Sequence, residues 1–401
     1  MKLLVVTQYY YPEQFRINDI CKQWVKRGHQ VTVLTGIPNY PEGKYYNGYG
    51  ITKKRREVKD GVEIVRIPII PRGKNSIMLM LNYISFIISG FFWIRFTKRN
   101  FDKVFIYEVS PMTQALPGIW YAKKKKIEAS IYVMDLWPES IELATGIKNK
   151  KILNLVGKMV DYIYKNCDTI LTSSESFMET IAKRGHPREK MVFWPQYAEE
   201  FYKPLDKKDC IIPEMDENKF KIVFAGNIGY AQGLDIIVET AQILKHKKCD
   251  VVFFLIGNGR AKAELMEKVK QNQLNDYIKF IDKQPAEKIP EYYANADMAF
   301  ITLKKDLISD QILPAKLPSY FACGVPILGS ANGEIKKVIE KSKAGYCVEA
   351  GNAEELEKQI ETCMKLSKEE LHKMKEKSRQ FYNENFEQQL LLNKFEEKIL
   401  N

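Results

Sequence analysis

The chain has 401 residues, of which 45% are hydrophobic and 28% are charged, which is typical of a soluble globular protein. This length exceeds the usual size of one hydrophobic core and favours two domains. The net charge of +12 lies in the first half: residues 1–195 hold 31 Lys and Arg against 17 Asp and Glu, a balance of +14. Such an excess favours nucleic acid or an anionic membrane surface as the partner. Because no nucleic-acid motif is present, we expect the membrane and exclude nucleic acid.

Seven cysteines are scattered without the spacing of a metal site or a disulfide framework. They predict reduced core residues in a cytosolic protein and no zinc site. The N-terminal run Met1–Thr7 is followed by polar residues too soon for a secretory signal, so we interpret it as a first buried strand.

The first half alternates short apolar runs with helical patterns, which indicates a parallel α/β sheet. A helix is expected from Arg16 to Arg27, which precedes Gly28. The predicted strands are Lys2–Thr7, Gln30–Thr35, Val62–Ile67, Lys103–Ile106, Ala129–Met134, Thr169–Thr172 and Met191–Phe193.

Residues 77–96 form the most apolar run and are long enough to span a bilayer. Asn82, Ser85 and Ser89 draw one narrow polar stripe along such a helix, and strands on both sides of it belong to one predicted sheet, so we expect the helix to lie on a membrane surface. Cations that would contact anionic headgroups flank it: Arg72, Lys74, Arg95, Lys98, Arg99 and Lys103. A helix buried in the flank of the sheet, or at a dimer interface, is the alternative.

The second half begins with a polar linker over residues 196–218 and continues as a second α/β unit over 219–380. A charged helical stretch, residues 381–401, ends the chain. The strands predicted in this half are Phe220–Gly226, Val251–Ile256, Ile278–Phe280, Met298–Ile301, Pro326–Leu328 and Gly345–Val348.

One cation, Lys316, is expected at the start of a helix within Pro314–Leu328. A lysine beside the free N–H groups of a helix start can bind a diphosphate, because both the donors and the helix dipole favour anions. A solvent-exposed lysine on an ordinary helix is the alternative.

Two glycine-containing loops follow predicted strands of the second unit, where backbone N–H groups can approach a phosphate. The first contains Gly226, Asn227, Gly229 and Gln232, and the second contains Gly257, Gly259 and Arg260. Tight strand–helix connections without a ligand fit the same pattern, and Arg260 fits a solvated arginine equally well.

In the first half, Asp135 and Glu139 follow a predicted strand, so they are candidate catalytic carboxylates at the edge of the sheet. An N-cap Asp with a first-turn Glu fits the same spacing. Tyr10, Tyr11, Glu13 and Tyr40 are candidate acceptor-side residues, since tyrosines that follow strand ends often line sugar sites.

The segment Pro314–Leu328, the two glycine loops and three first-half motifs (Gln8–Glu13, Gly28–Thr35 with Pro38–Gly43, and Asp135–Ser140) resemble the family 4 retaining glycosyltransferases. The resemblance is strongest to bacterial capsule, O-antigen, colanic-acid and fucosamine transferases. It implies the GT-B fold, in which two Rossmann-like doubly wound domains face each other across a cleft. It also implies that the second domain binds a nucleotide-sugar, and that the terminal helix packs back towards the first.

The chain departs from the pattern of that family at four positions. Asn227 and Gln232 stand where most members carry an Arg and a Lys, and Gln311 and Ser319 stand where most carry two glutamates. The neutral side chains can still hydrogen-bond sugar hydroxyls, and Glu334 is a candidate substitute ligand, although an ordinary helix-start Glu is the alternative.

The resemblance implies transfer of an N-acetylated hexosamine or deoxyhexosamine from a UDP-sugar to a polyprenyl-diphosphate-linked glycan, at the inner face of the cell membrane. No cofactor or metal is expected, because the leaving phosphate can accept the proton of the incoming hydroxyl and no Asp-x-Asp motif is present. A UDP-sugar 2-epimerase of the same fold and an inactive binding partner remain as alternatives.

Overall fold

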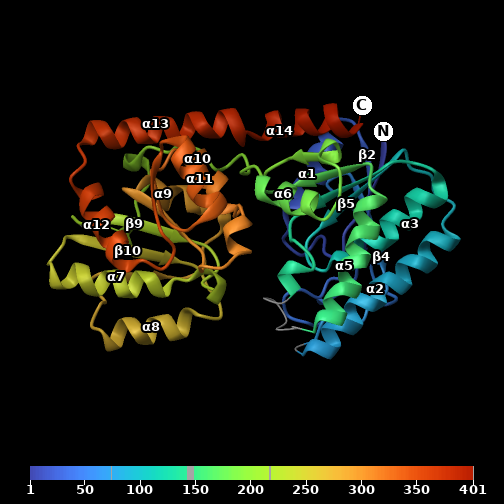
Figure 1. Ribbon diagram of the computed structural model, residues 1–401, viewed down its shortest axis with the longest axis horizontal. Coiled ribbons are helices and arrows are strands. Elements are labelled where there is room, and N and C mark those ends of the chain that lie inside the picture. The colour runs from blue at the N-terminus through green and yellow to red at the C-terminus, as the bar shows by residue number, and fades with distance from the viewer. Residues whose placement is uncertain (74, 142–148, 216–217, 401) are drawn as a thin grey trace. The chain divides into compact units, whose positions relative to one another are not determined.

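The computed structural model describes residues 1–73, 75–141, 149–215 and 218–400. It divides the chain into two compact units (Figure 1). The first unit contains Met1–Trp194 and the last residues from Ile399 onward, and the second contains Pro195–Lys398. The predicted linker therefore groups with the second unit. Lys74, one of the cations predicted to flank the apolar helix, lies outside the described residues.

The first unit is built on an eight-stranded sheet in the order β3-β4-β2-β1-β5-β6-β7-β8. All its pairings are parallel except that of β3 with β4. The strands are β1 Lys2–Val6, β2 Gln30–Gly36, β3 Arg56–Lys59, β4 Val62–Ile67, β5 Lys103–Glu108, β6 Ala129–Val133, β7 Thr169–Thr172 and β8 Met191–Phe193. The seven predicted strands are confirmed, whereas β3 was missed because an exposed, polar edge strand has no apolar run to mark it.

The helices of this unit cover both faces of the sheet. They are α1 Arg16–Lys26, α2 Ser76–Phe96, α3 Ala115–Lys125, α5 Lys150–Lys165 and α6 Glu175–Lys183. Neighbouring residues of β5 point to opposite faces: Phe105 stacks edge-on with Trp24 of α1, whereas Ile106 lies under Gly118 of α3. Helices α1 and α3 therefore lie on opposite faces, and α2 packs beside α3.

The apolar helix α2 is attached to the unit by its narrow polar stripe, the one predicted from Asn82, Ser85 and Ser89. Asn82 is fully buried and donates to the carbonyl of Ile70 (2.6 Å), and the Ser85 hydroxyl accepts from the backbone N–H of Ile70 (2.9 Å). The Ser89 hydroxyl donates to the carbonyl of Pro68 (2.5 Å). The stripe thus forms hydrogen bonds with the backbone N–H and carbonyl groups of the segment between β4 and α2. The opposite, apolar face of the helix points away from the unit.

The second unit contains a parallel six-stranded sheet in the order β11-β10-β9-β12-β13-β14. Its strands are β9 Phe220–Ala225, β10 Val251–Ile256, β11 Ile278–Ile281, β12 Met298–Thr302, β13 Ile327–Ser330 and β14 Gly345–Val348. All six predicted strands are confirmed. The strand order reverses direction between β9 and β12, and open α/β sheets bind ligands at the carboxyl edge of such a switch point.

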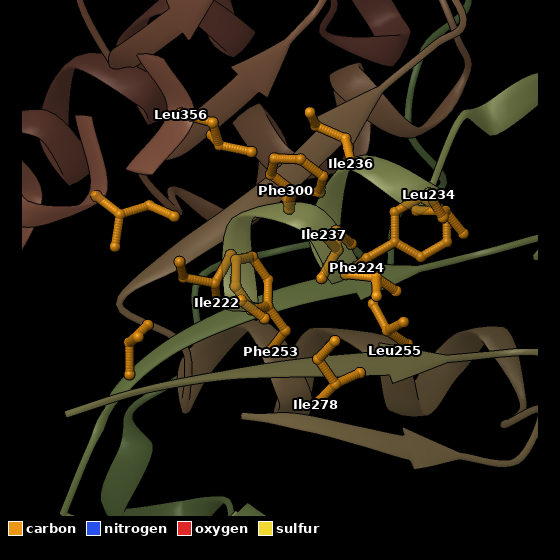
Figure 2. Close-up of a cluster of buried hydrophobic side chains, with 14 of the residues drawn as sticks. Ile222, Phe224, Leu234, Ile236, Ile237, Phe253, Leu255, Ile278, Phe300 and Leu356 are labelled. Atoms are coloured by element: carbon orange, nitrogen blue, oxygen red, sulfur yellow. The ribbon is translucent and has the colours of Figure 1, made fainter. Parts of the chain in front are cut away.

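The core of the second unit lies between this sheet and α7 Asp235–His246, α8 Lys262–Gln271 and α12 Ala353–Met364. Figure 2 shows Phe253 and Phe300 of the sheet gathered with Ile237 of α7 and Leu356 of α12. Helices α9 Ile289–Ala294, α10 Lys316–Cys323, α11 Gly333–Ser342 and α13 Lys368–Asn385 complete the unit, with α14 Gln388–Phe395 after them. The charged C-terminal stretch is therefore divided into successive helices.

Candidate functional site

The two glycine loops of the second unit lie side by side at the carboxyl edge of the sheet. The N–H of Ile228 donates to the carbonyl of Asn258, and the N–H of Ala261 donates to that of Ile228 (2.9 and 3.0 Å). A Cβ on Gly257 would lie 1.9 Å from the carbonyl oxygen of Gly226. Glycine is required at position 257 because the two backbones touch. The packing of the loops therefore explains this glycine without any ligand.

Lys316 reaches the first glycine loop from the start of α10. Its amine donates to Oε1 of Gln232 (3.2 Å) and lies 3.8 Å from the ring centroid of Phe224. A Cβ on Gly226 would lie 3.2 Å from this amine. The side chain as a whole is only partly buried, but its amine end is enclosed, and this burial lowers the pKa of Lys316 to about 7. An amide and an aromatic ring do not neutralise the charge, so an entering anion would be its counter-ion.

The other predicted donor-side residues fall into an exposed and a buried group. Asn227 and Arg260 are exposed on the two loops. Ser319 is buried in α10, one turn after Lys316, and Glu334 is buried in the first turn of α11, where it faces Lys337 at 3.7 Å. Gln311 is half-buried and donates to the carbonyl of Leu307 (3.0 Å). Of the predicted donor-side residues that the structure describes, Gln232 is hydrogen-bonded to Lys316 and Gly226 lies next to its amine.

A second cation that sequence reasoning missed lies beside the first glycine loop. Lys304 follows β12, and its N–H donates to the carbonyl of Ala231 (3.1 Å). Its amine lies 6.0 Å from the ring centroid of Tyr230. Since β9 and β12 flank the switch point, Lys304 restores a positive charge near the loop that lacks the usual Arg and Lys. The available signal was a lysine two residues after the end of a buried strand.

In the first unit, Asp135 lies just after β6, where its Oδ2 accepts from the N–H of Ser110 (2.9 Å). Beneath it is Glu108, the last residue of β5, which is fully buried and was also missed. The Oε2 of Glu108 faces the N–H of Asp135 at 3.4 Å. Burial, and then the charge of Asp135, hold the pKa of Glu108 well above its usual value. The pair thus consists of a buried Glu108, whose neutral form is favoured by its raised pKa, beneath a partly exposed Asp135.

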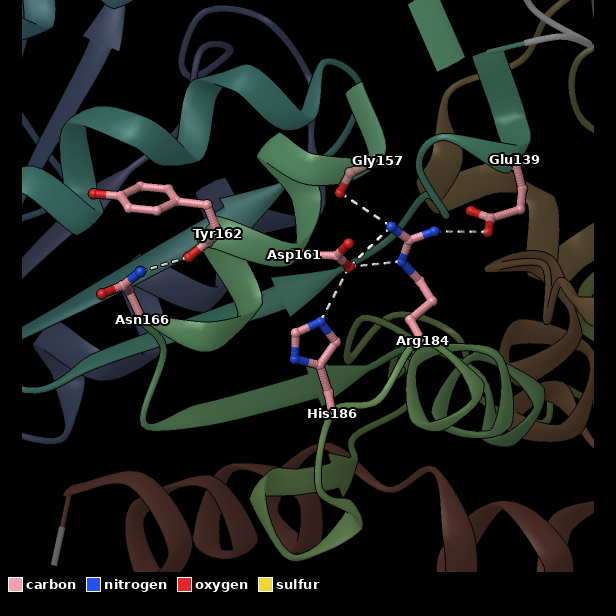
Figure 3. Close-up of polar contacts among 7 residues, drawn as sticks. All are labelled: Glu139, Gly157, Asp161, Tyr162, Asn166, Arg184 and His186. Atoms are coloured by element: carbon pink, nitrogen blue, oxygen red, sulfur yellow. Dashed lines mark hydrogen bonds and ion pairs between the residues drawn. The ribbon is translucent and has the colours of Figure 1, made fainter. Parts of the chain in front are cut away.

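Glu139 is held in a different set of contacts (Figure 3). Its Oε1 lies 3.6 Å from Nη1 of Arg184, and Nη2 of Arg184 lies 2.8 Å from Oδ1 of Asp161. The Nε2 of His186 lies 3.2 Å from the same oxygen. This network ties the segment after β6 to α5 and to the segment after α6, which favours a structural role for Glu139 over the predicted catalytic one.

The predicted acceptor-side residues are distributed between the core and the surface. Tyr10 is buried and its hydroxyl contacts Cys21 of α1, so its side chain faces the core instead of a surface site. Glu13 is also buried and accepts from the N–H groups of Tyr10, Asn39 and Tyr40 (3.2, 2.8 and 2.7 Å). Burial raises the pKa of Glu13 to about 7 in spite of these hydrogen bonds. Glu13 thus fixes the loop that carries Tyr40.

Tyr40 is exposed within an aromatic cluster that includes Tyr9 and Phe15, with ring centroids 5.4 and 5.5 Å away. The guanidinium of Arg72 lies 5.2 Å from the Tyr40 ring. Tyr11 is half-buried, and the Lys59 amine lies 5.6 Å from its ring.

Tyr83 lies within electrostatic range of Arg72, Tyr40 and Asp135. Burial raises the pKa of Tyr83, Arg72 lowers it, and the charge of Asp135 raises it further. One edge of the first unit therefore presents aromatic faces, a guanidinium and a carboxylate, which are the groups that recognise sugars and phosphates.

Residues 208–381 match the family described as "Glycosyl transferases group 1", and residues 14–196 match the one described as "Glycosyl transferase 4-like domain". The chain is a glycosyltransferase of the family 4, GT-B type.

Similar proteins agree with this assignment. The chain is 27% identical over 386 residues to a protein of Escherichia coli that bears the name colanic acid biosynthesis glycosyl transferase WcaI, covering 92% of this chain and 93% of that one. It is 23% identical to the amylovoran biosynthesis glycosyltransferase AmsK of Erwinia amylovora, over 60% of this chain and 63% of that one.

Solved structures share the fold at low identity. The Anabaena protein Alr3699/HepE in complex with UDP superposes with a TM-score of 0.71 at 13% identity, over all of both chains. WaaG, a glycosyltransferase involved in lipopolysaccharide biosynthesis, gives 0.66 at 11% identity, also over both whole chains. At these identities the likeness shows the GT-B fold alone.

Proposed function

We propose that this glycosyltransferase is a retaining enzyme that transfers a sugar from a UDP-sugar to a lipid-linked glycan during assembly of a bacterial surface polysaccharide. The sugar is an N-acetylated hexosamine or deoxyhexosamine, and the acceptor is carried on a polyprenyl diphosphate. The names of WcaI and AmsK, which refer to colanic acid and amylovoran biosynthesis, support the polysaccharide, and the complex of Alr3699/HepE with UDP supports the nucleotide.

The observation that carries the donor part of the proposal is the position of the Lys316 amine. It lies at a glycine loop on the switch-point edge of the sheet, and burial has already lowered its pKa. A diphosphate bound there restores the charge of the amine and receives a charge-assisted hydrogen bond. Lys304 and Arg260 add positive charge around the same two loops.

The acceptor part rests on Asp135, which is held by the N–H of Ser110 above the buried Glu108, whose pKa is raised. In retaining transfer the leaving phosphate takes the proton of the attacking hydroxyl, and the protein supplies orientation and electrostatic stabilisation. Asp135 orients that hydroxyl or stabilises the cationic sugar of the transition state. Tyr40 and Arg72 offer a ring face and a cation to the glycan or its diphosphate.

The membrane part rests on α2, whose outward face is apolar, together with the positive balance of the first half. Helix α2 is the one helix among the described residues that is long and apolar enough to cross a membrane, and 22% of its most apolar window is buried. Because β4 and β5, on either side of it, belong to one sheet, we propose that α2 lies on the inner face of the cell membrane and does not cross it.

A panel of UDP- and GDP-sugars tests the proposed function, with thermal stabilisation and donor hydrolysis as the measurements. We expect UDP and UDP-N-acetylhexosamines to raise the melting temperature and to be hydrolysed slowly, with release of UDP. Product analysis separates the alternatives, since a 2-epimerase interconverts two UDP-sugars without releasing UDP, and an inactive binding partner turns over none of them. Stabilisation by GDP-sugars but not by UDP-sugars would contradict the proposed donor.

A further inference from the structure

A groove of about 630 Å³ runs along the C-terminal half of α2 in the first unit. The end of β4 and the start of β3 form one wall, and α2 with the residues that follow it forms the other. The apolar residues in its lining are Ile67, Pro68, Phe92, Trp93 and Phe96. None of the candidate donor or acceptor residues lines this groove.

Four cations line the same groove, and no lining residue is acidic. Arg99 is neutralised by Glu63, to which its Nη2 donates at 2.7 Å. Arg55 donates to the carbonyls of Ile51 and Arg66, and burial lowers its pKa. The side chains of the remaining two, Arg56 and Lys98, form neither a hydrogen bond nor an ion pair within the part of the chain that the structure describes. Glu63 also lies within electrostatic range of Arg56, but one carboxylate does not balance four cations, so the groove keeps a net positive charge.

The apolar wall of the groove continues onto the outer face of α2. Phe92 and Phe96 are 54% and 74% exposed. Further exposed apolar residues extend this surface along the helix: Ile77, Met80, Leu81, Ile84, Ile88 and Phe91. A free phosphate gains nothing from the aromatic wall, and a neutral lipid gains nothing from the cations. An amphiphile with a phosphate headgroup matches both.

We propose that this groove binds the phosphate of an anionic phospholipid headgroup, while the acyl chains of the lipid lie against the outer face of α2. The inference rests on the membrane association contained in the proposed function, and adds to it a defined site for one lipid. Arg56 and Lys98 contact the phosphate, and Phe92 and Phe96 contact the glycerol and the upper chains.

The test compares two double variants of the full chain that each lose two charges from the first half. Arg56→Gln with Lys98→Gln changes the groove, and Lys22→Gln with Lys26→Gln changes exposed residues of α1 on the opposite face of the sheet. Partition is measured into phosphatidylcholine vesicles with and without phosphatidylglycerol. We expect the groove variant to lose at least about tenfold in affinity for the anionic vesicles and the α1 variant less than about threefold. An equal loss in both variants would overturn the proposal. It would mean that binding depends only on the overall positive charge of the first half and not on a site in the groove.

A second measurement separates the lipid from other occupants. Soluble dihexanoyl-phosphatidylglycerol and inorganic phosphate are titrated against the wild-type chain and the groove variant. Tighter binding of the short-chain lipid, abolished in the groove variant, supports the site. Equal binding of inorganic phosphate, or a dimer in solution that the groove variant dissociates, overturns it.

Hydrolysis of the free UDP-sugar, measured on the same samples, keeps the two proposals distinguishable. Loss of lipid binding in the groove variant with unchanged hydrolysis supports the groove as a site separate from the chemistry. If no variant hydrolyses any donor but the lipid titration succeeds, the donor proposal fails and the groove stands. If the wild-type chain hydrolyses donor but binds no vesicle, the groove and the membrane association fail together.

Discussion

At the scale of single residues, Lys316 is the most informative side chain of the second unit. Its amine contacts an amide and an aromatic ring at the edge of a glycine loop. We expect Lys316→Ala to weaken UDP binding at least tenfold, because loss of a charge-assisted contact costs about 1.5–3 kcal/mol. Lys305→Ala is the matched control, since the amine of Lys305 pairs with Glu349 (2.6 Å). Unchanged UDP affinity in a folded Lys316→Ala protein would remove this residue from the site.

The pKa of Lys316, lowered to about 7, predicts how affinity for a UDP-sugar depends on pH. A UDP-sugar is used because its esterified diphosphate does not titrate in this range, whereas the terminal phosphate of free UDP loses its last proton at about pH 6. Bound diphosphate favours the charged amine and raises its pKa, so below pH 7 the amine is charged in both states and affinity is flat. Above pH 7 the free enzyme loses this proton, binding must take it up again, and affinity falls by up to about tenfold per pH unit. Isothermal titration from pH 6 to pH 9 in buffers of different ionisation enthalpy measures this uptake. The same series on Lys316→Ala should be flat, and a parallel slope in both proteins would assign the proton to another group.

Asp135 and Glu108 form a pair with separate roles. We expect Asp135→Asn to lower kcat for transfer by about a hundredfold or more, because it removes a charge that orients or stabilises the reacting groups. Glu108→Gln should stay within about tenfold, since a neutral amide of similar shape replaces a buried carboxyl whose raised pKa disfavours its charged form. Circular dichroism and UDP affinity check that both variants are folded. Wild-type turnover in Asp135→Asn would exclude it as a catalytic residue.

At the scale of elements, α2 is positioned by two contacts that have no connection with a membrane. Its polar stripe binds the backbone before it, and a Cβ on Gly90 would lie 2.5 Å from Pro117 of α3. The buried side of the helix is therefore narrow, which leaves an apolar face exposed along its length. An exposed contiguous apolar face on an otherwise globular unit indicates a surface that binds something.

We expect Ile84→Ser, Ile88→Ser and Phe91→Ser together to release the protein from anionic vesicles, because the three side chains are 41%, 51% and 52% exposed on the outer face. Hydrolysis of the free donor should be unchanged. The control is Ile152→Ser with Leu155→Ser on α5, which are also exposed. This choice avoids Trp93, whose ring centroid lies 6.0 Å from that of Tyr121. Normal transfer to a lipid-linked acceptor by a folded, unbound triple variant would show that α2 is not the anchor.

At the scale of the whole molecule, the positive charge is concentrated in one half of the chain. The first half holds the excess of 14 positive charges, and the second half is nearly balanced. The proposed attraction of the first unit to anionic lipid would be screened by salt, whereas the proposed apolar contact of α2 would not. Vesicle binding that weakens but persists as salt rises is therefore the expected behaviour of the full chain.

Removal of metal ions tests whether the protein alone can neutralise the donor phosphates. The structure offers lysine amines and a helix start to the donor phosphates at one sheet edge. We expect transfer to continue at its normal rate in EDTA, since these groups supply the charge that a bridging ion would otherwise supply. Loss of activity in EDTA with recovery on addition of Mg²⁺ or Mn²⁺ would contradict this expectation.

The sequence alone determined the architecture, because buried parallel strands are continuous apolar runs and their order along the chain is read directly. It also predicted a phosphate site at Lys316 and the two glycine loops, since a cation at a helix start and glycines directly after strand ends are the pattern that suits a phosphate. That site stays a prediction. The sequence could not show that Gly257 meets the backbone of Gly226, that Arg184 holds Glu139, or that Tyr10 faces α1. Those contacts join residues that are distant along the chain.

The orientation of α2 about its own axis is another feature that the sequence could not show. The spacing of its polar residues predicted a polar stripe. However, Asn and Ser side chains can hydrogen-bond equally well to water or to unpaired backbone groups. Only the tertiary structure placed Pro68 and Ile70 against it and turned the apolar side outward. The buried Glu108 likewise had no signal in the sequence beyond its place at a strand end, because its raised pKa depends on the low-dielectric surroundings and on Asp135, which follows the neighbouring strand.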